Sequence, residues 1–191
     1  MSSFTESVRA RVLEPVSGDA PIRTAVGVVA FALMTAFSAQ VAVRLPWTPV
    51  PVTLQPLLIV LAGVFLGRRA GAASMAAYVA AGALGAPIFS NGAAGLPWLF
   101  GPTGGYLLAA PAAAFVAGWV AGRDGRPGRL LAGLALGVVT LYAGGVTQLM
   151  ALTGQGLGHA LSLGVVPFLV GDVTKILVAF FGILSLRAAR R

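Results

Sequence analysis

The chain has 191 residues, of which 58% are apolar and only 9% charged, and its formal net charge is +8. A soluble domain carries about 25% charged residues, so this composition indicates an integral membrane protein. The basic residues form short clusters between apolar runs, which is typical of membrane topology and argues against a nucleic-acid-binding face. The chain has no cysteine, which excludes disulfides, thiolate metal sites and cysteine nucleophiles.

The sequence predicts an all-α membrane protein with a short leading segment and one membrane domain. Residues 1–23 are polar and mixed in charge and lack the apolar core of a signal peptide, so we expect a cytoplasmic N-terminal segment. Residues 24–191 are predicted to form a single domain of six transmembrane helices. The predicted spans are Thr24–Val43, Thr53–Gly67, Gly71–Leu84, Thr103–Ala121, Leu130–Leu152 and Val165–Leu184. The second and third are shorter than the roughly twenty residues of a perpendicular span, so we expect tilt or shielding by neighbours.

Small residues are frequent in the first span. Ala32 and Ala36 lie four residues apart, a spacing that lets another helix approach closely. This face either docks a partner protein or packs inside the bundle.

The first loop, Arg44–Val52, contains three prolines around Trp47 and Thr48, and proline fixes an extended path at little entropic cost. Gln55 follows near the start of the second span. It is a candidate donor in a ligand pocket, although packing against a loop carbonyl explains it equally well.

A long uncharged segment, Gly85–Gly101, joins the third and fourth spans and contains Phe89, Asn91 and Trp98. Solvated loops are usually more polar, so we expect this segment to fold back over the membrane face and cover something. The fourth span then begins with Gly101-Pro-Thr-Gly-Gly-Tyr106. Free backbone N–H groups at a helix start, beside glycines that allow close approach, favour the binding of an anionic or carbonyl group.

The sixth predicted span carries Asp172 and Lys175, the only acid and the only lysine inside an apolar run. Each charge near a helix centre costs roughly 2.5–3.5 kcal/mol on an insertion scale. A spacing of three residues places both charged groups on one helix face, where they neutralise each other and can line a polar cavity. The pair is either a structural ion pair or part of a binding site, and we favour the binding site. The lone His159 has no other imidazole or thiolate to join it, so no metal site is expected.

Arginine placement predicts the topology. With a cytoplasmic N-terminus, eleven of the twelve arginines lie on the cytoplasmic side and only Arg44 lies opposite. Both termini are then inside. Asp172 lies eight residues, or about 12 Å, below the start of the last span at Gly164, in the outer half of the bilayer. The two loops, the start of the fourth span and the charge pair can therefore meet in one external pocket.

These residues resemble a known family, the biotin-specific S-components of energy-coupling-factor vitamin transporters (the BioY family). The resemblance rests on Pro49-Val-Pro-Val-Thr-Leu-Gln55, Gly85-Ala-Pro-Ile-Phe89, Gly101-Pro-Thr-Gly-Gly-Tyr-Leu107 and Gly171-Asp-Val-Thr-Lys175. It implies a biotin pocket that uses Asp172, Lys175, Asn91 and Tyr106, covered by the first loop from Trp47 to Thr53. The longer charged N-terminal segment departs from the family pattern.

The chemistry of biotin suits such a pocket. Its planar ureido group has two N–H donors and one carbonyl, and its tail ends in a carboxylate. Asp172 can accept from the N–H groups, and Lys175 or Asn91 can donate to the carbonyl. Phe89, Trp98 and Tyr106 would enclose the rings, with Gln55 and Thr48 as further candidate contacts. In an alternative pose Lys175 binds the tail carboxylate.

Energy coupling is expected to come from other chains, because the sequence contains no G-x-x-x-x-G-K-[ST] phosphate loop. The resemblance implies a transmembrane coupling subunit and ATPase subunits as partners, contacted through the Ala32 and Ala36 face, in a prokaryotic inner membrane. No cofactor is expected. A self-sufficient carrier is the alternative, although no convincing internal repeat supports it. An intramembrane enzyme would need a nucleophile paired with a base, which the sequence does not offer.

Overall fold

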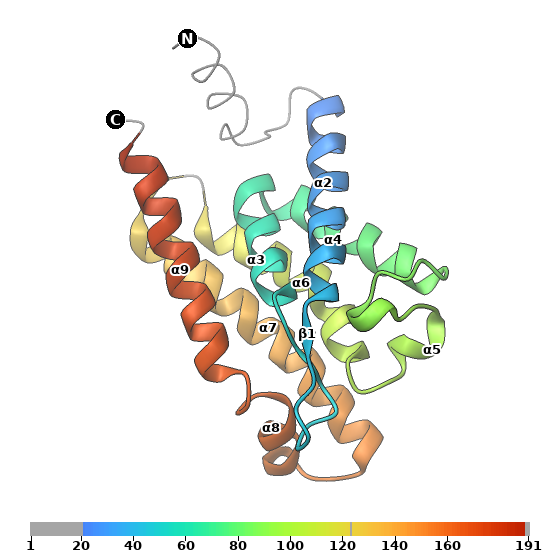
Figure 1. The fold of residues 1–191 in the computed structure, drawn as a ribbon. Coiled ribbons are helices and arrows are strands. Elements are labelled where there is room, and N and C mark those ends of the chain that lie inside the picture. Colours follow the sequence, from blue (N-terminus) through green and yellow to red (C-terminus); the bar gives the residue numbers. More distant parts are fainter. Residues whose placement is uncertain (1–20, 123, 190–191) are drawn as a thin grey trace.

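The structure, a computed structural model, describes residues 21–122 and 124–189. Most of these residues are helical, and two short strands pair antiparallel, with Ala42 opposite Thr53. The elements in chain order are α2 (Pro21–Gln40), β1 (Ala42–Val43), β2 (Val52–Thr53), α3 (Gln55–Leu66), α4 (Arg68–Ala83), the 3-10 helix η1 (Ser90–Gly92), α5 (Leu96–Leu99), α6 (Gly104–Ala121), α7 (Pro127–Thr153), α8 (Leu157–Gly164) and α9 (Leu169–Ala188) (Figure 1). The predicted N-terminal segment lies outside the described residues except for its last three.

Each of the six predicted spans overlaps one helix of the structure, namely α2, α3, α4, α6, α7 or α9. In the part of the chain that is described, four helices are long and apolar enough to cross a membrane: α2, α6, α7 and α9. The helices α3 and α4 have 12 and 16 residues, and Gly67, with φ 82°, joins them directly. At 1.5 Å per residue they are about 18 and 24 Å long, which is less than the hydrocarbon thickness of about 30 Å.

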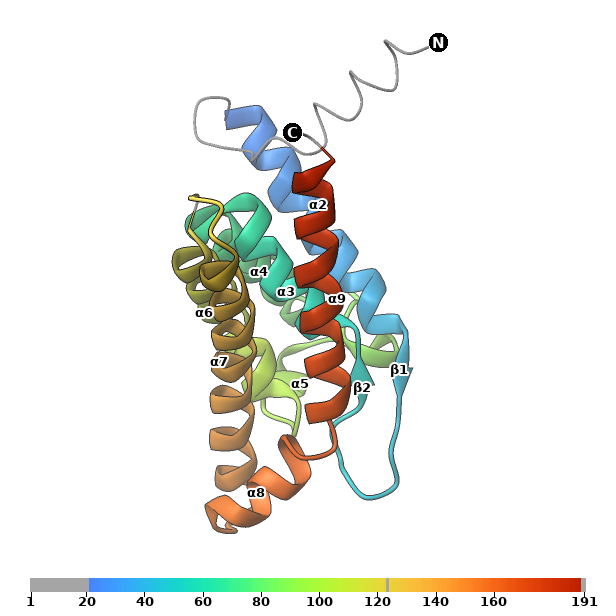
Figure 2. The ribbon, with the colours of Figure 1, turned by 90° about the vertical axis from the view of Figure 1, so that its left-hand side faces the viewer.

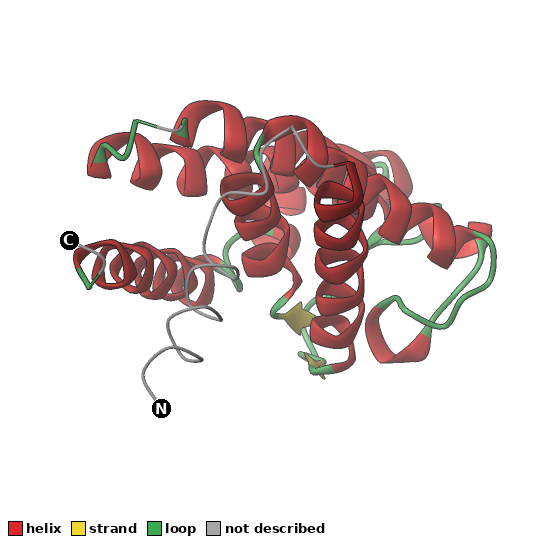
Figure 3. Ribbon diagram, turned by 90° about the horizontal axis from the view of Figure 1, so that it is seen from above, coloured by secondary structure: helices red, strands yellow, loops and turns green. Residues whose placement is uncertain are grey.

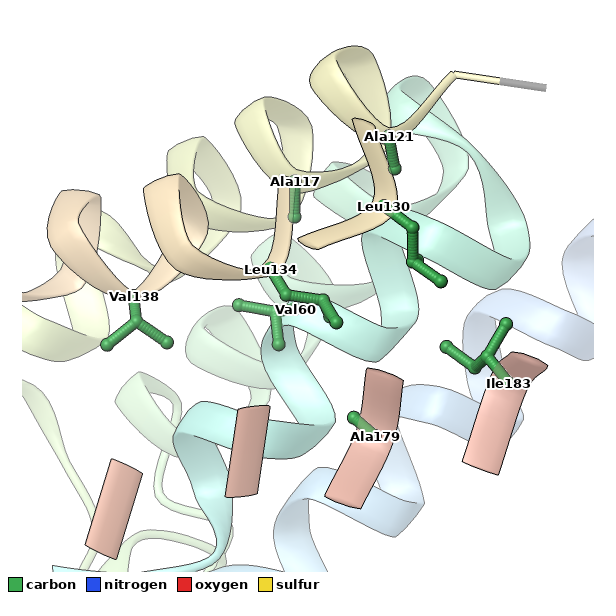
Figure 4. Packing of buried hydrophobic residues seen from close by; sticks show 8 residues of the cluster. All are labelled: Val60, Ala117, Ala121, Leu130, Leu134, Val138, Ala179 and Ile183. Carbon is green, nitrogen blue, oxygen red and sulfur yellow. The ribbon is translucent and has the colours of Figure 1, made fainter. Parts of the chain in front are cut away.

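The core forms where α3, α6, α7 and α9 meet. The buried side chains there come from all four helices, and Figure 4 shows them facing one another: Val60, Ala117, Ala121, Leu130, Leu134, Val138, Ala179 and Ile183. The backbones of α3 and α6 touch at Gly63 and Gly118, where a Cβ on either residue would collide with the other helix. Small residues let membrane helices approach this closely. Van der Waals packing then stabilises the association of the helices, because the hydrophobic effect does not drive helices together in lipid.

The two ends of the bundle differ. The start of α2 and the end of α9 lie at one end, while α8 and the loop between β1 and β2 lie at the other (Figures 1 and 2). Arg187, near the end of α9, donates to the carbonyl of Gly125 between α6 and α7. One groove is lined by Pro21, Arg68 and Gly122, so the start of α2 and the α3–α4 junction also share this end. The arginine-rich segments of the described chain therefore meet at one end.

The last long helix begins later than predicted. α9 starts at Leu169, whereas the predicted span starts at Val165, because residues 165–168 form turns around Pro167. Proline lacks an N–H and disfavours the α conformation in the residue before it. The preceding segment, predicted as a loop, contains α8. Seen from above, α9 lies to one side of the other helices (Figure 3).

The prediction that Ala36 forms part of a docking face on the first span is wrong. This residue is only 7% exposed and packs in a cluster with Tyr78 and Phe89, and Ala32 packs against the same cluster. Ala36 therefore serves internal packing, which was the alternative interpretation, and Ala32 lies partly buried beside it. The spacing alone could not decide this point, because it does not reveal which side of the helix the bundle covers.

Candidate functional site

A partly enclosed cavity lies at the end of the bundle opposite the arginine-rich end. It holds about 680 Å³ of empty space, part of it open to solvent. Its walls come from the first turns of α3, α6 and α9 and from the middle of α7, with the segments before α3 and α6 as further walls. Its lining residues are Val50, Pro51, Thr53, Gln55, Pro56, Ile59, Ser90, Trp98, Thr103, Tyr106, Leu107, Val138, Leu141, Tyr142, Phe168, Asp172 and Lys175. Most are apolar, with a few polar groups among them, which is the usual composition of a small-molecule site.

The predicted charge pair forms one wall of this cavity. Lys175 Nζ lies 2.7 Å from Asp172 Oδ1, and the two side chains are 15% and 4% exposed. Asp172 occupies the first turn of α9, where the helix dipole favours a negative charge. The prediction placed Asp172 eight residues after the start of its helix. Because α9 begins only at Leu169, Asp172 is closer to the helix start than predicted.

Both members of the pair have further partners on other elements. The hydroxyl of Tyr142 on α7 donates to Asp172 Oδ2 over 2.6 Å. Lys175 Nζ donates to the carbonyl of Thr53 on β2 over 2.7 Å. Hydrogen bonds to charged groups contribute about 1.5–3 kcal/mol each. The pair thus ties α9 to α7 and to the hairpin while it faces the cavity.

Gln55 faces the cavity and is held in place by neighbouring hydroxyls. Its Nε2 donates to Tyr78 Oη on α4 at 2.8 Å, and Tyr78 donates in turn to the carbonyl of Ile88 at 3.1 Å. The Thr53 hydroxyl donates to Gln55 Oε1 at 3.2 Å. Gln55 is thereby fixed between the hairpin and the segment after α4.

Tyr106 lines the cavity from α6. Its hydroxyl donates to the carbonyl of Gly164 at the end of α8 over 2.6 Å. The ring lies directly over Gly145 on α7, where a Cβ would overlap it. Tyr106 therefore presents its ring to the cavity and uses its hydroxyl to hold the α8–α9 connection.

Trp98 lines the cavity from α5, and its indole nitrogen is exceptional. Nε1 is the one buried side-chain nitrogen or oxygen among the described residues that has no hydrogen-bond partner. Native proteins pair the large majority of such atoms. Its segment is itself held by Gln148 on α7, whose Nε2 donates to the carbonyls of Leu99 and Gly101. The segment therefore lies against α7 and contributes Trp98 to the cavity wall.

Three predicted site residues do not line the cavity. Phe89 is 0% exposed and stands edge-on to Tyr78, with ring centroids 5.7 Å apart, so it supports the wall from behind. Asn91 is exposed, with φ 59°, and its neighbour Ser90 lines the cavity instead. Thr48 donates to the carbonyl of Leu163 over 2.6 Å and so anchors the first loop to α8. In each case the loop path, which sequence spacing does not define, determines where the side chain points.

Sequence reasoning missed Tyr142 and the carbonyl of Thr53. Tyr142 is a phenol within the fifth predicted span, and a hydroxyl at that depth needs a partner. This signal could have identified it. The role of the Thr53 carbonyl depends on hairpin geometry and has no side-chain signature.

The fold and the cavity together define a multi-pass helical membrane protein with a buried ion pair that faces a partly enclosed cavity near one end. The BioY family matches residues 9–191. The chain belongs to this family. Its relatives include a probable biotin transporter from Pyrococcus horikoshii, 38% identical over 78% of this chain and 86% of the relative. The biotin transporter of Thermotoga maritima is also 38% identical, over 72% of this chain and 80% of the relative.

A solved structure resembles the fold closely. It is the crystal structure of the S-component for biotin from an ECF-type ABC transporter, which matches with a TM-score of 0.78 at 23% identity, over 89% of this chain and 92% of that one. The chain therefore has an S-component fold.

Proposed function

We propose that this protein binds biotin in the cavity and captures it for uptake across the prokaryotic cell membrane, as the substrate-binding subunit of an energy-coupling-factor transporter. The observation that carries the proposal is the Asp172–Lys175 pair, at 2.7 Å, on the wall of a largely apolar cavity. Relatives at 38% identity are named as biotin transporters, which supports this ligand.

The chemistry of the pair suits the ureido end of biotin. That end needs an acceptor for its N–H groups and a donor for its carbonyl, and a carboxylate beside an ammonium offers both. The alternative pose, with the tail carboxylate at Lys175, would leave the ureido N–H groups to other acceptors. We therefore place the ureido group at Asp172 and Lys175.

We propose six membrane spans with both termini in the cytoplasm. Arg23, Arg68 and Arg187 share one end of the bundle, and the loop with Arg44 lies at the other, so the positive-inside rule supports this orientation. The cavity would then open to the outside, where it meets its ligand. The short helices α3 and α4 would span by local thinning of the bilayer, with neighbouring helices shielding their ends.

The partners proposed are a transmembrane coupling subunit and ATPase subunits, because an S-component fold is one part of such a transporter. The contact would use a surface other than the buried Ala36. Uptake by this chain expressed alone would favour the self-sufficient carrier.

Calorimetry on the purified protein tests the ligand. Biotin should bind well above thiamin and riboflavin. Clear binding of another vitamin without heat from biotin would overturn the proposal. Uptake of labelled biotin, measured with and without coexpressed coupling and ATPase subunits, then separates the transporter subunit from the self-sufficient carrier.

A further inference from the structure

The groove lined by Arg68 lies at the arginine-rich end of the bundle, opposite the cavity. It holds about 1910 Å³ of empty space, part of it open to solvent. Residues of α2, of the α3–α4 junction and of the last turn of α6 form its walls, and we call it the α2–α6 groove. Val28, Val64 and Phe65 give it an apolar wall, and Arg69 lines it beside Arg68. Biotin binding in the cavity makes no use of this groove.

The two arginines of the α2–α6 groove have no carboxylate partner among the described residues. That part of the chain has two carboxylate side chains, Asp124 and Asp172. Asp124 pairs with Arg126 and Arg129, at 3.5 and 3.0 Å. Asp172 pairs with Lys175. The other three acids of the sequence lie outside the described residues. The described chain therefore leaves two exposed guanidinium groups beside an apolar wall, a combination that fits an anion with an apolar body.

The contact that Arg68 makes leaves its hydrogen-bond donors available. Its guanidinium carbon lies 5.9 Å from the centroid of the Phe115 ring on α6. A cation–π contact of this kind holds the cation through the ring face and uses none of its N–H groups. A planar guanidinium presents these donors as a fork that matches the oxygens of a phosphate. Arg68 is therefore held at the groove with its donors still free to bind an anion.

The α3–α4 junction is recessed relative to the neighbouring helix ends. The start of α2 and the end of α9 extend beyond it (Figures 1 and 2). The helix before the junction, α3, has only 12 residues, or about 18 Å. Trp119, in the last turn of α6, is 58% exposed and also lines the groove, and tryptophan is typical of the headgroup level of a bilayer. A lipid headgroup beside Trp119 can thus reach Arg68 and Arg69.

We propose that the α2–α6 groove binds one anionic phospholipid. Its phosphate accepts hydrogen bonds from Arg68 and Arg69, and an acyl chain packs along the apolar wall. Basic pockets between transmembrane helices suit anionic lipid headgroups for this reason. The bound lipid bridges α2 and the α3–α4 junction, and it holds the headgroup layer at the level of the short helices. The inference is independent of which ligand the cavity binds.

Native mass spectrometry of the purified protein in neutral detergent tests the site. Phosphatidylglycerol and phosphatidylcholine with identical acyl chains are titrated, and the affinity for each is measured. One basic residue near an anionic headgroup corresponds to about a fivefold gain in affinity, so two arginines predict a preference of about thirtyfold for phosphatidylglycerol. The double variant Arg68→Gln with Arg69→Gln should lose this preference. Glycerol 3-phosphate, which buries no acyl chain, should bind more weakly than phosphatidylglycerol by more than about tenfold.

Two matched controls separate this site from general effects. Arg126 is exposed at the same end of the bundle and is not among the residues that line the groove, so Arg126→Gln should keep the preference. Ala73→Trp leaves every charge in place and fills the groove wall, and it should weaken the binding of phosphatidylglycerol even where the double variant folds poorly. Ala80→Trp, at an exposed position about two turns further along α4, should leave that binding unchanged.

Equal loss of the preference in Arg126→Gln and in the double variant would overturn the site, because net charge alone would then explain it. A preference that persists in the double variant would overturn it as well. Equal affinity for glycerol 3-phosphate would show an anion site without a lipid. Loss of assembly with a coupling subunit in the double variant, at an unchanged lipid preference, would assign the groove to a protein partner instead.

Discussion

Tyr142 on α7 donates its hydroxyl hydrogen to Asp172 on α9 over 2.6 Å, which gives the buried carboxylate a second partner besides Lys175. Both carboxylate oxygens are thus engaged. Few residues of α9 are buried, namely Asp172, Ala179 and Ile183. Because apolar packing holds α9 only sparsely, the polar network at its first turns is expected to matter for its position.

Replacing Tyr142 by Phe should therefore destabilise the protein. The change keeps the ring and removes one hydrogen bond to a charged group, at a cost of about 1.5–3 kcal/mol. Thermal unfolding in detergent should show a lower Tm, and biotin affinity should fall because Asp172 is held less firmly. Thr140→Val on the same helix is the control, since Thr140 bonds only within α7. A Tm equal to that of the wild type would show that the hydroxyl adds nothing to the network.

The orientation prediction follows from the two ends of the bundle. A reporter that is active only in the cytoplasm should work when fused after Arg191 and fail when inserted at Trp47, in the loop at the opposite end. The positive-inside rule gives the reason, because the segments around Arg68 and Arg126 resist translocation. The reverse pattern of activity would reject the model with both termini inside.

The long helices were predictable, because apolar runs of this length have few alternatives in a membrane. The exact start of α9 was not predicted, although Pro167 gave a usable signal. The helix α8 and the pairing of β1 with β2 were missed, since short elements in loops depend on tertiary contacts such as that of Thr48 with Leu163. Periodicity carries no information about such contacts.

The cavity was predictable in part. Asp172 and Lys175 were identifiable because buried charge is costly and therefore rare in an apolar helix. Gln55 and Tyr106, near the starts of their spans, and Trp98, from the long uncharged segment, line the same cavity. Phe89 and Asn91 point elsewhere, because consecutive residues of an irregular segment face different directions. Direct contact of any of these residues with biotin stays a prediction.

The buried position of Ala36 leads to a prediction about packing. Ala36→Leu should insert three carbon atoms into the cluster with Tyr78 and Phe89, and overpacking of this kind costs about 1–3 kcal/mol. Thermal unfolding should show the loss, and biotin affinity should fall with it because Tyr78 holds Gln55. Ala30→Leu is the matched control, since Ala30 is exposed on the same helix. Loss of assembly with a coupling subunit, at unchanged stability and affinity, would restore the docking interpretation.

The charge pair permits the sharpest test of whether the site binds ligand or only holds helices. Removing one member of a buried pair leaves the other uncompensated, at a cost on the order of 3–5 kcal/mol. Asp172→Asn leaves Lys175 without its counter-charge, and Lys175→Ala leaves Asp172 with only Tyr142. Both single variants should lose stability and biotin affinity together, so neither alone separates the two roles.

The double variant Asp172→Asn with Lys175→Met separates them. It removes both charges and keeps an amide oxygen that can accept from Tyr142. Without buried charge it should fold about as well as the wild type or better. If the pair binds the ureido group, biotin affinity should nevertheless fall steeply, because the ligand loses the carboxylate that accepts its N–H groups. Thermal unfolding and calorimetry on the same preparation measure both quantities. A stable double variant with wild-type affinity would show that the pair only ties α9 to its neighbours and that biotin binds elsewhere.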